Sequence, residues 1–271
     1  MPELPEVESV RRQLHPRLAG RRIVAVTVDP QARFGDVTAA VGHRIAGVGR
    51  RGKYLIAPLQ AGGDGGGLEL VLHLGMTGSL RFRGDGWTPD PYVRASLHLD
   101  EGVLDFRDVR RFGRLTVVAA GDYTGIATLA GLGPEPLGPE FHPDRFHAAL
   151  AATRTAVKPA LLGQRLVAGV GNIYADEALW RACINPHARR VGRSRAHALW
   201  RAIREVLAEA IQREGTTFRD YRMLNGASGR NRDFLAAYGR AGRPCHRCGT
   251  PLAKVVLGGR GTTYCRACQR R

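Results

Sequence analysis

The stretch CHRCGTPLAKVVLGGRGTTYCRAC, residues 245–268, carries four of the five cysteines of this 271-residue chain. Cys245 and Cys248 form one Cys-x2-Cys pair, and Cys265 and Cys268 form a second pair after sixteen intervening residues. This spacing is typical of a four-cysteine zinc site. Because four thiolates fill a tetrahedral coordination sphere, we expect one structural Zn²⁺ ion and no open catalytic position.

The residues between the two cysteine pairs predict a β-hairpin. Two strand-like runs flank the sequence GGRG, which places Arg260 at the tip of the turn. Residues 240–271 hold eight Lys or Arg residues and no Asp or Glu. A zinc hairpin with this charge indicates a polyanionic partner, most simply a nucleic acid.

The whole chain shares this charge bias. It has 41 Lys and Arg residues against 24 Asp and Glu residues, a formal net charge of +17, and its lysines are only Lys53, Lys158 and Lys254. A hydrophobic content of 44% excludes a disordered tail protein. The charge argues against an ordinary metabolic enzyme and favours a polyanion partner, although a basic surface without a partner stays open.

The segment GLGPEPLGPEFHP, residues 131–143, predicts a linker because it holds four prolines and three glycines. The part before it is rich in β-branched runs with few intervening helical patterns, which indicates a β-sandwich. The strand-like runs are residues 22–28, 53–59, 68–74, 79–84, 93–99, 103–109 and 114–120, with GGDGGG (62–67) as a flexible hairpin tip.

Helices are expected at the N-terminus and after the linker. Residues 4–18 place apolar side chains on one helical face, and the helix should end or kink at Pro16. Later helices are expected after a capping Asp144, around Pro159, at 173–182, and at 195–214 with Gly215 as the C-cap.

These patterns together predict an α+β fold in four parts. They are an N-terminal β-sandwich domain with an N-terminal helix (1–130), the linker (131–143), a helical domain (144–239) and the zinc hairpin (240–271). The acidic start MPELPEVESV is not a signal peptide, and no run of 18 apolar residues predicts a membrane span. We expect a monomer that acts in the cytoplasm, at the nucleoid.

The N-terminus could supply a nucleophilic amine for covalent catalysis. Removal of Met1 would leave Pro2 with a secondary amine whose pKa is about 7.7–8.0. Such an amine can attack an aldehyde-level carbon and form an iminium ion, which an always-protonated arginine cannot do. Glu3 could supply a proton. The alternative is that Glu3 and Glu6 only stabilise the start of a helix.

Seven motifs occur in an order that closely resembles bacterial formamidopyrimidine-DNA glycosylases across essentially the whole chain. They are MPELPEVE (1–8), RRGKYL (50–55), HLGMTGSL (73–80), DVRRFG (108–113), KPALLGQRLVAGVGNIYADEAL (158–179), GTTFRDY (215–221) and the four-cysteine finger. The resemblance implies a base-excision-repair enzyme that removes oxidised purines, chiefly 8-oxoguanine and formamidopyrimidines, from double-stranded DNA. It also implies strand cleavage at the abasic site by β,δ-elimination.

The resemblance assigns roles to individual residues. The catalytic set would be Pro2 as nucleophile, Glu3 as proton donor, Lys53 as helper and Arg260, for which phosphate clamping is the preferred role. The DNA contacts would be His73, Arg154, Lys158 and Asn172 at phosphates, with Met76, Arg110 and Phe112 filling the space left by the everted base. VAGVGNIYADE would be the turn of a helix–two-turn–helix, residues 215–229 a lesion-capping loop, and Glu177 an acid near the amine.

One departure from the family pattern lies at PYVR (91–94), where many members carry a histidine pair; Tyr92 or Arg94 would replace that contact. Two alternative functions stay open. The first is an endonuclease VIII-like glycosylase for oxidised pyrimidines. The second is a non-catalytic zinc-finger protein that binds DNA.

Overall fold

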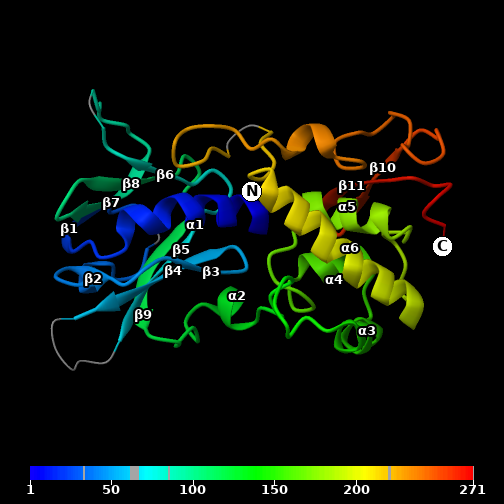
Figure 1. The fold of residues 1–271 in the computed structure, drawn as a ribbon, viewed down its shortest axis with the longest axis horizontal. Helices are drawn as coiled ribbons and strands as arrows, with labels where there is room; N and C mark the ends of the chain where they lie inside the picture. Colours follow the sequence, from blue (N-terminus) through cyan, green and yellow to red (C-terminus); the bar gives the residue numbers. More distant parts are fainter. Residues whose placement is uncertain (33, 62–66, 85, 219–220, 271) are drawn as a thin grey trace. The chain divides into compact units, whose positions relative to one another are not determined.

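The structure is a computed structural model that describes residues 1–32, 34–61, 67–84, 86–218 and 221–270 (Figure 1). The chain divides into two compact units. Unit 1 comprises Met1–Ala130 and Glu214–Arg230, and unit 2 comprises Gly131–Arg213 and Asn231–Arg271. No helix in the described part of the chain combines the length and the apolar character needed to cross a membrane.

Unit 1 is a β-sandwich of two antiparallel sheets, which confirms the predicted fold class. The first sheet has the order β1 (Ile23–Val28), β7 (Val93–Leu99), β8 (Val103–Arg107), β6 (Ser79–Phe82). The second has the order β2 (Arg44–Ile45), β4 (Tyr54–Gln60), β5 (Leu68–His73), β9 (Arg114–Ala119), with β3 (Gly49–Arg51) also paired to β4. Each of the seven predicted runs contains a strand. Residues 62–66 of the expected hairpin tip lie outside the described residues.

Helix α1 (Leu4–Leu18) supplies one apolar face to the core that both sheets share. Its residues Val7, Val10, Leu14 and Leu18 are all buried in that core. The helix continues through Pro16, so of the two expectations for this residue, an end or a kink, the end is wrong. Burial of Leu18 and the bond from the Ala19 N–H to the His15 carbonyl hold the last turn together. Two short helices, η1 (Thr38–Ala40) and α2 (Ala127–Ala130), complete the unit.

Unit 2 is helical and ends in the predicted hairpin. Its elements are α3 (Pro143–Ala151), α4 (Val157–Leu162), α5 (Asn172–Arg181), α6 (Arg193–Gln212), η2 (Asn231–Phe234), β10 (Ala253–Leu257) and β11 (Arg260–Tyr264). The N-cap of α3 is His142, not Asp144, because Pro143 already occupies the first helical position and the His142 ring accepts the Asp144 N–H. Asp144 instead pairs with Arg193, at 2.9 Å.

Two segments lie in other parts of the fold than the sequence predicted. Within unit 2, the expected linker is packed: the Gly133 N–H donates to the Gln164 carbonyl at 2.8 Å, and Phe141 is 2% exposed. Residues 214–230, expected in the helical domain, belong to unit 1 because Tyr221 and Met223 are buried in its core. Helix α6 accordingly ends at Gln212, and Gly215 is not its C-cap.

A fully buried ion pair fastens the zinc hairpin to the helices of unit 2. Lys158 Nζ on α4 lies 2.7 Å from Asp176 Oδ1 on α5, and it donates to the Gly261 carbonyl and to Thr262 Oγ1 on β11. The other oxygen of Asp176 accepts the Thr263 N–H at 2.9 Å. Burial raises the pKa of Asp176 to about 7 in spite of the attached ammonium group. Three elements therefore meet at one charge pair.

Removing one partner of this pair should cost more than removing both. Asp176→Ala leaves the Lys158 ammonium buried without a counterion, which should lower the free energy of unfolding by about 3–5 kcal/mol. The double variant K158M/D176L removes both charges and should lose less than either K158M or D176A alone. Denaturant unfolding of the zinc-loaded protein measures this. Additive losses in the double variant would contradict a coupled pair.

Candidate active site and nucleic-acid interface

The first residues of the chain form the start of α1 in a reciprocal cap. Glu3 is the N-cap, its carboxylate accepts the N–H of Glu6, and Glu6 Oε2 accepts the Glu3 N–H at 2.7 Å. Both glutamates are buried, as is Pro2, whereas Met1 is 53% exposed. The capping box therefore fixes the backbone immediately after Pro2. It also fixes the carboxylate of Glu3, one residue after the predicted nucleophile.

The other oxygen of Glu6 holds the segment Glu214–Arg230. Glu6 Oε1 accepts the Thr216 N–H at 2.7 Å, and the Tyr221 hydroxyl donates to the Glu6 carbonyl at 3.3 Å. Gly215 has φ +81°, and a Cβ there would lie 2.7 Å from Glu6 Oε1, so only glycine fits. From the sequence, Glu6 was expected only to stabilise the start of the helix. Its spacing of three residues from Glu3 was the available signal.

Lys53 lies in the turn between β3 and β4 and is 3% exposed. Arg50 holds this turn against α1, because its Nε donates to Glu8 at 3.1 Å and its Nη1 donates to the Gly52 carbonyl at 3.0 Å. Although burial opposes it, the guanidinium groups around Glu8 hold the pKa of that carboxyl below its usual value. The predicted helper lysine is therefore carried by a turn that α1 itself positions.

His73, at the end of β5, is a neutral donor. Burial, together with the positive charges of Lys53 and Arg114, lowers its pKa to about 4. Its Nδ1 accepts the Gly75 N–H at 3.0 Å, so in the neutral ring the proton is on Nε2. The ring packs on Tyr54 with centroids 4.6 Å apart. One fixed N–H donor suits a phosphate oxygen at neutral pH.

Asp108 holds together the two loops that carry Met76, Arg110 and Phe112. Its buried carboxylate accepts the Gly113 N–H at 2.6 Å, the Arg110 N–H at 3.2 Å and the hydroxyl of Thr77. Phe112 is 56% exposed, and the Arg110 guanidinium lies 4.8 Å from the centre of its ring. The structure thus presents an aromatic wedge and a cation from one compact pair of loops, with the half-buried Met76 beside Thr77.

The segment PYVR offers one exposed side chain rather than two. Arg94 is buried and donates to the Asp108 carbonyl and to Asp29, both at 2.8 Å. It is therefore a structural residue, and the expectation that it could replace a DNA contact is wrong. Tyr92 is 41% exposed and lies 4.9 Å from the Arg107 guanidinium.

Of the four predicted DNA-contacting side chains of unit 2, two are exposed, one is half-buried and one is fully buried. Asn172 is the first residue of α5, and its Oδ1 is buried without a hydrogen-bond partner among the described residues. Arg154 is exposed, and so is Arg260, which follows the hairpin turn Gly258–Gly259. Lys158 is the exception. It is fully buried in the ion pair with Asp176, so the predicted phosphate contact is wrong.

Glu177 is also used inside unit 2. Its carboxylate accepts the N–H groups of Ala236, Ala237 and Tyr238, each at 2.8 Å. Burial raises the pKa of Glu177, although these three donors oppose the shift. The carboxylate thus organises the chain that leads from η2 into the zinc hairpin. The resemblance implied only an acid near the N-terminal amine, and nothing in the sequence indicated this structural task.

The four cysteines of the C-terminal pairs converge on one point. Their Sγ atoms all lie within 4.8 Å of one another. Zinc–thiolate bonds of about 2.3 Å place the sulfurs of a tetrahedral site about 3.8 Å apart, so the cluster fits one zinc ion. The indole of Trp180 donates to Cys245 Sγ at 3.4 Å, a contact that ties the cluster to α5. Cys183 lies outside the cluster.

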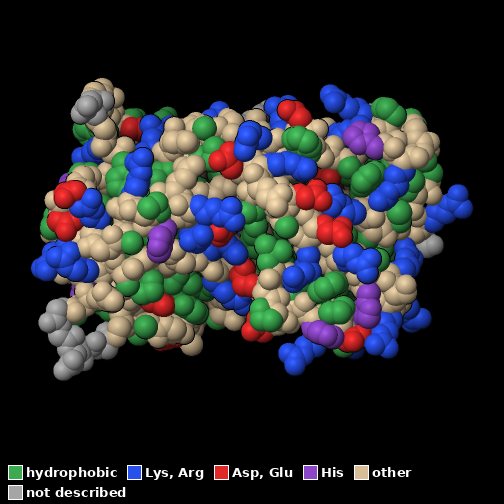
Figure 2. All heavy atoms as spheres, in the orientation of Figure 1, with side chains coloured by type: hydrophobic (Ala, Val, Ile, Leu, Met, Phe, Trp, Pro, Cys, Tyr) green, Lys and Arg blue, Asp and Glu red, His purple; other side chains and the backbone are tan. Residues whose placement is uncertain are grey.

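On one face of the protein, basic and acidic side chains are mixed. Figure 2 shows Lys and Arg side chains interspersed with Asp and Glu on the face in view. The net charge of +17 therefore does not by itself locate the interface, and individual residues must do so.

Family models match most of the chain. The formamidopyrimidine-DNA glycosylase N-terminal domain matches residues 1–115, the H2TH domain of the same family matches 132–222, and a zinc finger found in FPG and IleRS matches 242–271. The chain belongs to the formamidopyrimidine-DNA glycosylase family. The finger of this family and the clustered cysteines identify one structural zinc site.

Individual relatives of the family are similar over the full length. The formamidopyrimidine-DNA glycosylases of Thermus thermophilus and Deinococcus radiodurans are 47% and 45% identical, over 99% of this chain and 98% and 97% of theirs. The crystal structure of the T. thermophilus MutM (Fpg) protein has a TM-score of 0.90 at 46% identity, covering 99% of this chain and 98% of that one. A Lactococcus lactis Fpg variant in complex with Fapy-dG-containing DNA has a TM-score of 0.90 at 35% identity, covering both chains fully.

The low pKa of His73 predicts a stability change with pH. The ring stays neutral in the folded protein down to about pH 4, whereas in the unfolded chain it is protonated below its ordinary pKa of about 6.5. Its contribution to stability is therefore present above pH 6.5 and is lost as the pH falls to 4, with a slope of up to about 1.4 kcal/mol per pH unit. Denaturant unfolding of wild type and His73→Asn between pH 7 and 4 should show a shallower loss in the variant; equal slopes would contradict the assignment.

Zinc removal should unfold the hairpin without unfolding unit 1. Cys265→Ser breaks the tetrathiolate set, so metal analysis should give less than one zinc per chain. Hydrogen exchange should then accelerate in residues 253–264, because the metal supplies folding free energy to a hairpin with a small core. Protection of β5 and β9 should stay at wild-type level. A hairpin that keeps its protection after zinc loss would show that the contacts of Lys158 and Trp180 suffice.

Proposed function

We propose that this chain is a bifunctional DNA glycosylase and abasic-site lyase that excises oxidised purines through the amine of Pro2. The observation that carries the proposal is the capping box of α1, which fixes Glu3, the residue after the buried Pro2, at the start of a helix whose apolar face is buried. The family supplies the glycosylase activity, and the relative whose structure contains Fapy-dG DNA supports a ring-opened purine as substrate.

The chemistry begins once Met1 is removed. The lone pair of the Pro2 nitrogen attacks C1′ of the damaged nucleotide, the bond from C1′ to the base breaks, and the base departs with the amine proton. Glu3 protonates the ring oxygen, the sugar opens, and the nitrogen forms an iminium ion with C1′. The iminium acidifies the C2′ hydrogen, whose loss expels the 3′ phosphate. Loss of the C4′ hydrogen then expels the 5′ phosphate.

Other residues bind and hold the DNA. Lys53 is proposed to assist the chemistry near the lesion, including the elimination steps, and the neighbouring His73 is proposed to bind a phosphate through its neutral N–H donor. Met76, Arg110 and Phe112 are proposed to fill the space of the everted base, and the segment 215–229 to cover the lesion.

The contacts from unit 2 are proposed to be phosphate contacts. Asn172, Arg154 and the hairpin residue Arg260 carry the donors, and Asn172 has the added field of the N-terminus of α5. Tyr92, exposed on unit 1, is proposed as a further DNA contact. We further propose that the protein acts as a monomer, in the cytoplasm at the nucleoid, because chromosomal DNA is its substrate.

Borohydride trapping tests the amine mechanism. Reduction of the iminium should link the protein covalently to an 8-oxoguanine:C duplex when Pro2 is the first residue. The same chain behind an uncleaved N-terminal tag should give no adduct, because an amide nitrogen is not nucleophilic. Pro5→Ala with a free Pro2 is the matched control and should trap like wild type. An adduct from the tagged chain would overturn the mechanism.

The choice of duplex separates the remaining functions. A purine-specific enzyme should excise 8-oxoguanine and formamidopyrimidine faster than thymine glycol. A preference for thymine glycol would favour the endonuclease VIII-like alternative. Tight binding to every duplex with no excision and no adduct would favour the non-catalytic DNA-binding protein.

A further inference from the structure

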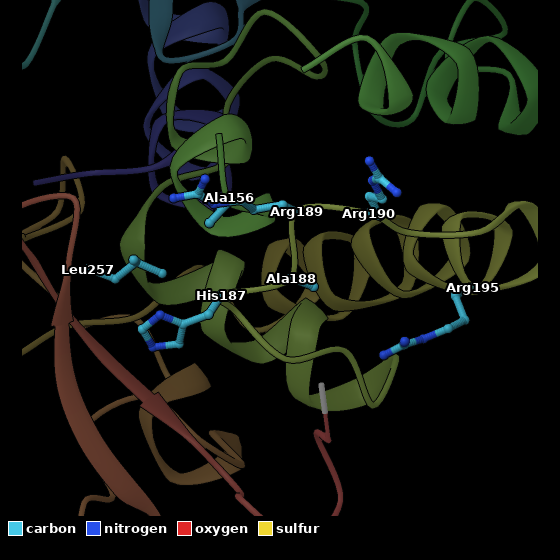
Figure 3. Close-up of a pocket in the computed structure, with 7 residues that line it drawn as sticks. All are labelled: Ala156, His187, Ala188, Arg189, Arg190, Arg195 and Leu257. Atoms are coloured by element: carbon cyan, nitrogen blue, oxygen red, sulfur yellow. The ribbon is translucent and has the colours of Figure 1, made fainter. Parts of the chain in front are cut away.

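Unit 2 contains a basic hollow that none of the proposed catalytic or DNA-contacting residues lines. Its volume is about 490 Å³, and its lining residues are Ala156, His187, Ala188, Arg189, Arg190, Arg195 and Leu257 (Figure 3). The lining thus includes three arginines and a histidine and no acidic side chain. Figure 3 shows that these residues come from the N-cap of α4, from the segment after α5, from the start of α6 and from the hairpin.

The floor of the hollow is a well-bonded turn. Asn185 Oδ1 accepts the His187 N–H at 2.9 Å, and the Ala188 carbonyl accepts the Val157 N–H at the start of α4, at 2.8 Å. The His187 ring packs edge-on against Tyr264 of β11, with centroids 6.0 Å apart. These contacts fix the two residues that directly precede Arg189 and Arg190.

The arginines of the hollow differ from their neighbours in having no acid. Arg181 pairs with Glu209 at 2.5 Å and Arg193 pairs with Asp144 at 2.9 Å, both in unit 2. Arg189 and Arg190 are exposed, and within the described residues neither makes an ion pair or a hydrogen bond. Two adjacent positive charges without a counterion repel each other, which an anion would relieve.

The third arginine stands where the backbone adds further positive potential. Arg195 lies in the first turn of the 20-residue helix α6. The N-cap of this helix, Gly192, supplies no side-chain cap, and its first turn contains no acidic residue. The positive end of the helix dipole adds to the charge of Arg195, although the Asp144 carboxylate lies against the same end of the helix, 2.9 Å from Arg193 and from His197.

The hairpin connects the hollow to the surface that is proposed to bind DNA. Leu257 lines the hollow and pairs in register with Arg260 across the turn. Guanidinium groups bind phosphate oxygens through paired hydrogen bonds. We infer that this hollow binds a backbone phosphate of the DNA strand that passes the hairpin tip. The inference rests on the proposed function, and it extends DNA binding to residues outside the lesion site.

The salt dependence of binding to undamaged duplex tests this site. The variant R189Q/R190Q should give a plot of log Kd against log salt whose slope is shallower by about 0.9 for each phosphate that the two arginines neutralise in wild type. R145Q/R201Q removes two equally exposed arginines of unit 2 and should keep the wild-type slope. R189K/R190K retains both charges and should also keep it. A wild-type slope in R189Q/R190Q, or an equally shallow slope in R189K/R190K, would overturn the inference.

A free anion is the competing occupant. Inorganic phosphate at constant ionic strength should raise the Tm of wild type more than that of R189Q/R190Q, because the same guanidinium groups bind phosphate from either source, and the DNA slope then decides between them. Selective stabilisation of wild type, with an unchanged DNA slope in the variant, would assign the hollow to a free phosphate compound and overturn the DNA inference. Absence of excision activity on damaged DNA would refute the proposed function. The salt slope could still be interpreted, because it is measured on an undamaged duplex.

Discussion

The proposed active site depends on the hydrogen bonds that the buried carboxylate of Glu6 accepts. Each of its oxygens accepts a backbone N–H at 2.7 Å, one from Glu3 and one from Thr216. A buried carboxylate is tolerable only when such donors are in place. The carboxylate therefore ties the start of helix α1 to Thr216, although about 210 residues separate Glu6 from Thr216 in the chain. The same bond that begins the helix fixes the position from which Pro2 can act.

Lysine and arginine have divided roles in this protein. Lys53 and Lys158 are buried, whereas Lys254 is exposed. Lys158 stabilises the attachment of the hairpin, and Lys53 is left as the cation that accompanies the N-terminal amine. Most of the arginines lie near the surface, where a group that never loses its proton suits phosphate binding. Composition alone predicted a polyanion partner but did not separate these tasks.

The sequence predicted those features that depend on local pattern. Alternating apolar residues located the seven long strands, the apolar face of residues 4–18 located α1, and cysteine spacing located the zinc site. Strands β2 and β3 were missed because two or three residues carry no periodicity. The buried state of Lys158 was missed because its partner, Asp176, lies on a different helix and its acceptors lie a hundred residues away. Long-range contacts also explain why residues 214–230 belong to unit 1 and not, as predicted, to the helical domain.

The central claim is that one secondary amine, held by the cap of α1, performs the covalent chemistry. Tandem mass spectrometry of the borohydride-reduced adduct with 8-oxoguanine DNA measures this most directly. We expect a single modified peptide that begins at Pro2, with the sugar remnant on the proline nitrogen. A remnant on Lys53, or on any other lysine, would contradict it.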